Sequence, residues 1–343
     1  MTPGIPGMVL HVFAALVAAS TLLLIFAGGL VTSTGSGLAV PDWPNTYGWF
    51  MFSFPLDKMV GGIFYEHGHR LIASTVGFLI VVLAVWLWHA ERRRWVRRLG
   101  FLALGAVITQ GILGGITVLW YLPDAISISH AGLAQLVFCL TITIALVTSR
   151  GWLRGYANGS GATTPADRAL QTLAGVTTAV IYIQILVGAT MRHTDAGLAI
   201  PDFPLAFGHL LPPHWDAKIA VHFAHRVGAL LVTTFILATT ARILFRHRDR
   251  RELVRPAVML LGLLAVQVTL GAYVIWTAKH FILNSAHVAT GGMVLGTSLV
   301  LTLRVHQARF AGAGRAKAED VAYDYNAAYI RRPDPNPSAG ANA

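Results

Sequence analysis

Gly37-Leu-Ala-Val-Pro-Asp-Trp-Pro44 is repeated later in the chain as Gly197-Leu-Ala-Ile-Pro-Asp-Phe-Pro204. The repeat extends beyond this motif, because further residues recur in the same order at nearly the same spacing. The recurring pairs are Gly48 and Gly208, His69-Arg70 and His225-Arg226, Leu113-Gly114 and Leu270-Gly271, and His130 and His287. Internal similarity of this kind predicts that the chain contains two copies of one structural unit.

Apolar stretches fill most of the chain around these motifs. Of the 343 residues, 55% are hydrophobic and 12% are charged, whereas a soluble domain has about 25% charged residues. Eight stretches reach the roughly 20 apolar residues that a helix needs to cross a bilayer. Their centres lie near Leu22, Val81, Thr109, Leu140, Tyr182, Thr233, Ala265 and Val294. We therefore predict an all-α integral membrane protein with eight transmembrane helices.

Four of these stretches fall in each copy of the repeat. An even number of spans brings both copies into the membrane from the same side, so the copies should be related by a pseudo-two-fold axis along the membrane normal. We expect two similar four-helix bundles, formed by residues 1–156 and 157–310. The tail 311–343 is rich in Ala, Gly, Pro and Asn and has no apolar period, which predicts disorder.

Basic residues outnumber acidic residues by 26 to 15. In a soluble protein this excess would suggest a nucleic-acid partner. Here most basic residues lie in the connections 92–98, 150–168 and 242–255 and after residue 304. The positive-inside rule places these segments and both termini in the cytoplasm and the long loops after the first and fifth spans outside. Anionic lipids explain the charge, so the bilayer of the cytoplasmic membrane is the predicted partner and nucleic acid is not.

Four histidines occupy matching positions near the outer ends of the even-numbered spans. They are His69, His130, His225 and His287. Ionisable residues inside a membrane are costly and usually mark function. Two imidazoles from two helices of one bundle can hold a haem iron from opposite sides, whereas a structural zinc site usually needs four convergent ligands. The pattern favours two haems, one held by His69 and His130 and the other by His225 and His287, over zinc.

Charged residues next to two of these histidines differ between the copies. Arg70 and Arg226 each follow a histidine, where a cation could bind haem propionates or reach the headgroups. Glu66 lies three residues before His69 on the same helical face, whereas His222 takes this place before His225. A buried carboxylate can exchange protons with a substrate, so Glu66 is the candidate catalytic residue, although an acidic residue also suits a helix start.

These residues resemble the haem A synthase family of bacterial and mitochondrial membranes over both halves, roughly from Val9 to Leu303. The resemblance rests on Glu66-x-x-His69-Arg70, on the repeated Gly-Leu-Ala-x-Pro-Asp loop and on the histidines at 130 and 287. It implies that the enzyme oxidises the C8 methyl of haem O to a formyl group. It also implies that Glu66, His69 and His130 serve the substrate haem and that His225 and His287 hold a resident haem b.

Further expectations follow from the resemblance. Two bis-histidine sites leave no open iron position, which suits removal of electrons from the methyl group with water as the oxygen source. The implied partners are haem O, a haem O synthase and a quinone or another membrane redox partner, and a homo-oligomer is compatible with the sequence. Many family members carry a cysteine pair in the first outer loop, but this chain has only Cys139, inside a span.

Two other functions share some of these features. A non-enzymatic dihaem cytochrome b that exchanges electrons with quinone would use the same histidines and would give Glu66 no task. A proton-coupled transporter would use the histidines as a relay and would bind no haem. A haem farnesyltransferase is not favoured, because an Asp-rich pair for diphosphate is missing from the sequence. His67, which lies off the face of Glu66 and His69, is interpreted as an interfacial residue.

Overall fold

The computed structural model describes residues 5–157 and 167–307, and the predicted disordered tail lies outside these residues. Eight helices in the described residues are 24 to 30 residues long and apolar enough to cross a membrane, which confirms the predicted spans. A continuous helix satisfies its own backbone hydrogen bonds, as a chain in lipid must. The spanning helices are α1 (Ile5–Ser33), α2 (Gly62–Ala90), α3 (Arg94–Leu119), α4 (Asp124–Val147), α6 (Arg168–His193), α7 (Ala217–Arg246), α8 (Arg251–Trp276) and α9 (Phe281–Val305).

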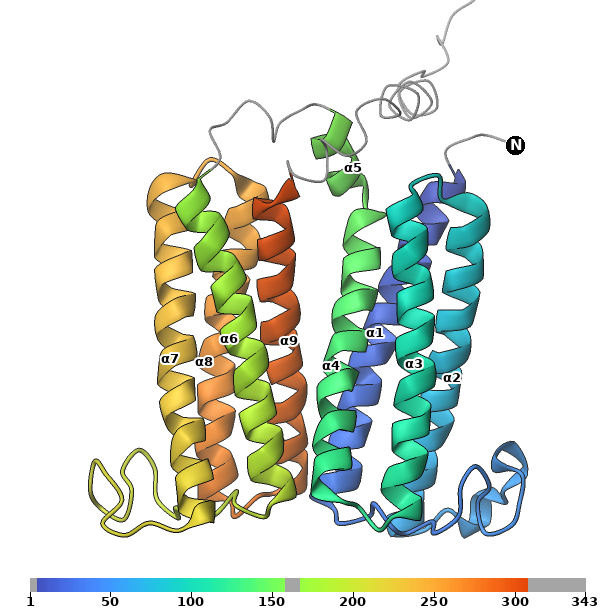
Figure 1. The fold of residues 1–343 in the computed structure, drawn as a ribbon, viewed down its shortest axis with the longest axis vertical. Helices are drawn as coiled ribbons and strands as arrows, with labels where there is room; N and C mark the ends of the chain where they lie inside the picture. Colours follow the sequence, from blue (N-terminus) through green and yellow to red (C-terminus); the bar gives the residue numbers. More distant parts are fainter. Residues whose placement is uncertain (1–4, 158–166, 308–343) are drawn as a thin grey trace, which may run out of the picture.

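The spanning helices form two groups of four that stand side by side (Figure 1). In the first bundle α1 packs against α2 and α4, and α3 packs against the same two helices; α6 to α9 form the second bundle in the same manner. The short helix α5 (Arg150–Ala157) follows α4. The predicted boundary at residue 156 falls at the end of this short helix. Each bundle is therefore a ring in which the two helices that carry the histidines stand diagonally.

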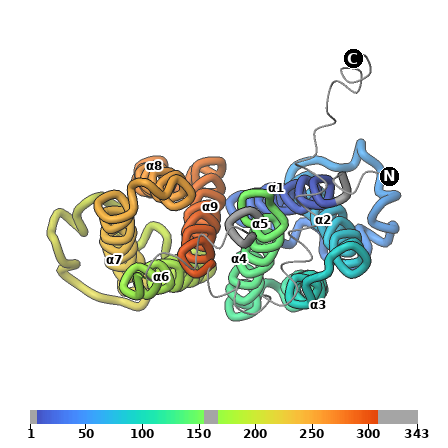
Figure 2. The backbone as a smooth tube through the Cα atoms, turned by 90° about the horizontal axis from the view of Figure 1, so that it is seen from above, coloured from blue at the N-terminus to red at the C-terminus, as the bar shows by residue number. Residues whose placement is uncertain are grey.

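Helices α1 and α4 contact α6 and α9 where the bundles meet, and Figure 2 shows α9 next to α1 and α4 in the view along the bundles. Glycines allow this close approach. A methyl group on Gly29 would lie 3.2 Å from the Ser285 Cα atom, and one on Gly132 would lie 2.7 Å from the Leu186 Cδ2 atom. Small residues at such contacts let helices pack tightly in lipid.

The connections α1–α2 and α6–α7 are the long loops, and both lie at the end of the bundles opposite to α5 (Figure 1). The first includes two 3-10 turns, η1 (Met51–Ser53) and η2 (Leu56–Lys58). Apart from Ile200 in the α6–α7 loop, the largest fully buried apolar side chains lie toward the other end. They include Ile80, Leu83, Leu87 and Ile144 in the first bundle and Ile236, Ile243, Leu260 and Leu295 in the second. The half of each bundle near the long loops thus contains fewer large buried apolar side chains.

Candidate functional site

The four predicted histidines lie in α2, α4, α7 and α9, in the half of each bundle next to the long loops. All four are half-buried. In the second bundle the ring centroids of His225 and His287 are 6.5 Å apart, with an angle of 65° between the ring planes. Two imidazoles that each bind one metal ion at about 2 Å have centroids roughly 6 Å apart, so this separation fits one ion between them. In the first bundle His69 and His130 are close enough to interact electrostatically.

Each of these imidazoles packs against a glycine on a neighbouring helix, which is α1 or α3 in the first bundle and α6 or α8 in the second. A methyl group built on the glycine would lie only 2.9 to 3.1 Å from the Cε1 atom of the ring. The four pairs are Gly28 with His69, Gly114 with His130, Gly188 with His225, and Gly271 with His287. A real methyl group essentially never lies as close as the 2.9 Å at Gly188, and the 3.1 Å at the other three is tighter than most contacts, so a side chain at these positions would require the ring to shift. The glycines therefore fix how each imidazole is oriented in its bundle.

Glutamine amides reach three of the histidines, and in the case of His287 the Gln267 Nε2 atom lies 3.3 Å from the ring Nε2 atom. Gln110 Nε2 donates to the His130 carbonyl oxygen over 3.0 Å. In the second bundle Gln184 Nε2 donates to the His225 carbonyl oxygen over 2.7 Å and lies 3.0 Å from the ring Nδ1 atom. The Nδ1 atoms of His69, His130 and His287 are buried and have no hydrogen-bond partner among the described residues. Buried polar groups without partners are rare, so these rings are expected to complete their interactions with a bound group.

The histidine pairs fit a ligand that is held by two imidazoles in each bundle. Among the residues that the structure describes, His, Cys, Asp and Glu side chains form no group of three or more that could hold a metal ion. A structural zinc site would need such a group, whereas an axially ligated haem needs two histidines. The histidine pairs, the glycines beside them and the buried ring nitrogens therefore suit haem better than zinc.

Glu66 is buried and anchors the first outer loop to α2. Its Oε2 atom accepts a 2.7 Å hydrogen bond from the Val40 backbone N–H. Its Oε1 atom accepts one of the same length from Arg70, with which it forms an ion pair. Arg70 also donates to the backbone carbonyls of Asp42, Asn45 and Val40. Glu66 and Arg70 together thus hold the loop over the end of the first bundle opposite to α5.

His222 and Arg226 make the corresponding contacts in the second bundle. The Ile200 backbone N–H donates to His222 Nδ1 over 3.2 Å. Arg226 donates to the carbonyls of Ile200, Asp202 and Leu205. The loop is therefore held in a similar way with an imidazole in place of the carboxylate, and the difference between the copies lies in the acid–base group.

The two outer loops also share an internal turn around an aspartate. The Asp42 carboxylate accepts hydrogen bonds from the N–H groups of Tyr47 and Gly48, and Asp202 accepts them from Phe207 and Gly208. The Gly208 N–H, followed by that of Phe207, holds the pKa of Asp202 below its ordinary value. The Asp202 carboxylate therefore supports the loop above the ordinary aspartate pKa of about 3.9, and this support is lost as pH falls through the lower pKa of the folded loop.

The contacts of the two arginines add a role that the sequence did not reveal. The contact of Arg70 and Arg226 with propionates stays a prediction, but the hydrogen bonds of these two side chains go to loop carbonyls and, for Arg70, to Glu66. The interpretation of His67 as an interfacial residue is wrong. Its side chain is only 1% exposed, and its Nδ1 atom lies 3.0 Å from the Thr46 hydroxyl in the outer loop.

Replacing Arg226 with glutamine tests the loop-anchoring role. Arg226→Gln should lower the free energy of unfolding by about 2 kcal/mol, because loop carbonyls lose a charged donor, and should make residues 197–208 easier to cleave. Thermal unfolding and limited proteolysis in detergent measure the two effects. Arg248→Gln, an exposed residue in the α7–α8 connection, is the control. Equal cleavage rates for the two variants would contradict the anchoring role.

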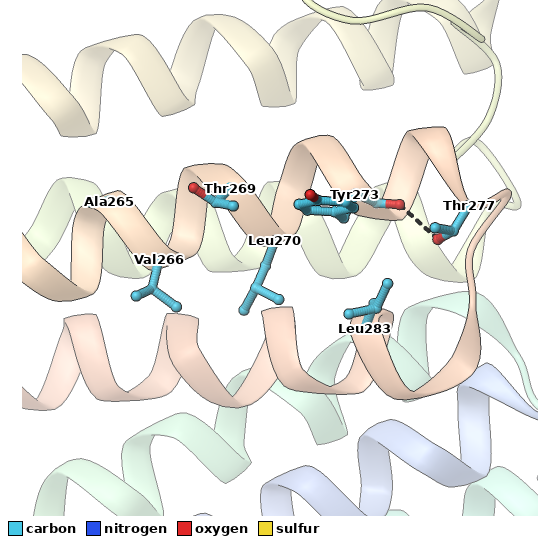
Figure 3. Close-up of a pocket in the computed structure, with 7 residues that line it drawn as sticks. All are labelled: Ala265, Val266, Thr269, Leu270, Tyr273, Thr277 and Leu283. Atoms are coloured by element: carbon cyan, nitrogen blue, oxygen red, sulfur yellow. Dashed lines mark hydrogen bonds between the residues drawn. The ribbon is translucent and has the colours of Figure 1, made fainter.

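A shallow apolar groove of about 580 Å³ lies on the second bundle between α8 and α9. Figure 3 shows Leu270 of α8 and Leu283 of α9 extending toward each other across it. The lining includes Tyr273 and Thr277, whose contact is a hydrogen bond from the Thr277 hydroxyl to the Tyr273 carbonyl. Leu270 precedes Gly271, the glycine that contacts His287. Helix α8 therefore both lines the groove and carries the glycine that contacts His287.

Fold and site together define an eight-span helical membrane protein with a histidine pair in each of two four-helix bundles. Residues 11–299 match the COX15-CtaA family of cytochrome oxidase assembly proteins. The chain is 32% identical to a heme A synthase of Symbiobacterium thermophilum over 73% of this chain and 80% of that protein. It is 26% identical to a heme A synthase of Geobacillus kaustophilus over 90% of this chain and 96% of that protein.

A third relative, a heme A synthase of Alkalihalophilus pseudofirmus, is 26% identical over 81% of this chain and 91% of that protein. The family match spans both bundles and all four histidines. The chain belongs to the COX15-CtaA family of cytochrome oxidase assembly proteins, which confirms the resemblance to haem A synthases.

Proposed function

We propose that this protein is a haem A synthase, which oxidises the C8 methyl of haem O to a formyl group and so supplies haem A to terminal oxidases. The observation that carries the proposal is the combination of a histidine pair in both bundles with a buried carboxylate, Glu66, beside only one pair. The three relatives described above are each named heme A synthase. The matched relatives do not favour a dihaem cytochrome b without enzymatic activity.

The two halves have different tasks in this proposal. In residues 1–156 His69 and His130 hold the substrate haem, and in residues 157–310 His225 and His287 hold a resident haem b. When bound, the resident haem supplies one-electron transfer. The glycines beside the histidines orient the imidazoles, and the loops held by Arg70 and Arg226 cover the outer ends of the bundles and limit the access of water.

Glu66 is the proposed catalytic residue because it is the acid–base group that distinguishes the first half from the second. Its carboxylate is held between the Val40 N–H and the Arg70 guanidinium. These donors fix the carboxylate one helical turn from His69, where it can receive a proton released as the methyl group is oxidised. His222, at the corresponding place, accepts from the Ile200 N–H and cannot supply the same negative charge.

The protein is proposed to lie in the cytoplasmic membrane with both termini in the cytoplasm. Two observations support this orientation. The connections rich in arginine lie at the end of the bundles opposite to the long loops, as the positive-inside rule requires. The similar contacts of the two loops and of the histidine pairs support a pseudo-two-fold axis along the membrane normal. Both histidine pairs then lie toward the outer face.

Oxidation of a methyl to a formyl group with water as the oxygen source releases electrons and protons. A quinone or another membrane redox partner is the proposed electron acceptor, and a haem O synthase is the proposed source of substrate. Cys139 in α4 is the single cysteine of the chain, so a cysteine pair in the outer loop takes no part in this protein. A homo-oligomer is compatible with the proposal.

Co-expression with a haem O synthase tests the function. Cells that contain both proteins should accumulate haem A, detected by extraction and chromatography of the haems. His69→Ala and His130→Ala should lower the haem A yield at least tenfold, because the substrate haem loses one of its two ligands, while the haem b spectrum of the purified protein is kept. A protein that carries haem b but never yields haem A would be a cytochrome, and a colourless protein would favour a transporter.

A further inference from the structure

Arg192 is a cation at the junction of the two bundles that the proposed function does not use. It lies near the outer end of α6, and its Nη2 atom donates to the Gly29 carbonyl of α1 over 2.6 Å and to the Ser33 hydroxyl over 2.8 Å. The Ser33 hydroxyl is held in turn by Asn284 and Ser285 of α9. Arg192 is therefore fixed by helices from both bundles and has a defined direction.

The guanidinium of Arg192 is not neutralised by the part of the chain that the structure describes. The ion pairs of the described residues engage Arg70, Arg93, Arg242 and Arg250, and none of these pairs includes Arg192. Its Nε atom is buried and has no hydrogen-bond partner among the same residues. Arg192 is half-buried, and a charge held partly out of water without a counter-ion is unfavourable. The arrangement is that of a binding site for an anion.

The position of Arg192 relates this anion site to the second histidine pair. Arg192 follows Gly188 by four residues, so both face the same side of α6. Gly188 is the residue against which the His225 ring packs, and Arg192 is also close enough to His287 to interact with it electrostatically. The cation thus lies about one helical turn outward from the level at which the imidazoles meet.

We propose that Arg192 binds a carboxylate of the porphyrin held by His225 and His287; this inference rests on the proposed function. Arg226, the cation expected from the sequence, donates to three loop carbonyls, whereas Arg192 keeps a buried donor free. The first bundle has Thr32, four residues after Gly28, in the corresponding position. The carboxylate site is therefore specific to the second bundle, and its cation favours the reduced form of the haem there.

Redox titration of the purified haem-b-containing protein tests the site. Arg192→Gln should shift the equilibrium toward oxidised haem about tenfold, which lowers the midpoint potential by about 59 mV for one electron, since a carboxylate left without its cation stabilises the ferric form. Arg192→Lys should shift it less. Arg248→Gln removes the same charge at the exposed α7–α8 connection, away from the histidines, and should leave the potential unchanged.

The dimethyl ester of haem b separates a porphyrin carboxylate from a lipid phosphate as the anion. Haem b should bind the wild type more tightly than Arg192→Gln, whereas the ester should bind both proteins with the same affinity, and an equal difference with both haems would overturn the proposal in favour of lipid. An unchanged potential in Arg192→Gln with haem b also overturns it. If Arg192→Gln does not accumulate, Arg192→Lys is compared with the wild type instead, again with haem b and with its dimethyl ester. A wild type that binds no haem b would instead refute the proposed function.

Discussion

Leucine in place of Gly188 or Gly271 should remove most of the haem b from the purified protein. A methyl group at these positions would already lie 2.9 and 3.1 Å from the Cε1 atoms of His225 and His287, and leucine adds further atoms against the same rings. Overpacking of this kind costs about 1–3 kcal/mol, and each 1.4 kcal/mol lowers affinity about tenfold. We expect haem b affinity to fall about 5- to 150-fold, seen as a lower haem b content per protein by pyridine haemochrome.

Gly175→Leu and Gly262→Leu are matched controls in the same two helices. A methyl group at either position would meet no heavy atom within 4 Å, so these variants should keep the haem b content of the wild type. Alanine at Gly188 should give a smaller effect, seen as a change in the low-spin electron paramagnetic resonance signal that reports ligand orientation. If leucine at Gly188 and at Gly175 had the same haem content, the glycine contact would not position the ligand.

The helices and the histidine pairs could be predicted from the sequence because each depends on local composition. A stretch centred near Leu22 or Val81 has one stable form in lipid, the helix, and the structure has helices at all eight predicted places. The repeat predicts that His69 and His225 lie at equivalent places in their bundles, and the structure has them near the start of α2 and α7. The contacts of α3 with α2 and α4, and of α8 with α7 and α9, follow from short connections between consecutive spans.

The contacts between helices could not be predicted in the same way. The packing of Gly188 against His225 depends on how two helices rotate against each other, which hydropathy does not specify. One signal was present, because Leu113-Gly114 recurs as Leu270-Gly271, but no partner could be assigned to it. Arg70 was expected at a ligand, and its direction toward loop carbonyls became visible only when the loop had been placed. The burial of His67 under the loop could not be predicted for the same reason, because it depends on where the loop lies.

Exchange of Glu66 for histidine should abolish haem A formation without releasing the outer loop. The second half shows that an imidazole can do the structural task, because His222 accepts the Ile200 N–H as Glu66 accepts the Val40 N–H. Arg226 likewise holds its loop beside a histidine in place of a carboxylate. Glu66→His therefore keeps an acceptor for the loop and removes the negative charge, and acid–base catalysis by such a group typically contributes 10²–10⁴-fold.

We expect the rate of haem A formation in Glu66→His to fall at least 100-fold, with the haem b spectrum and the protease resistance of residues 37–48 kept. Glu66→Ala, which lacks both charge and acceptor, should lose the activity and also expose this loop to protease, because the Val40 N–H and Arg70 are left without their partner. Comparison of the two variants separates chemistry from anchoring. Haem A formation at the wild-type rate in Glu66→His would show that the carboxylate serves only to hold the loop, and the proton acceptor would then have to be sought elsewhere in the first bundle.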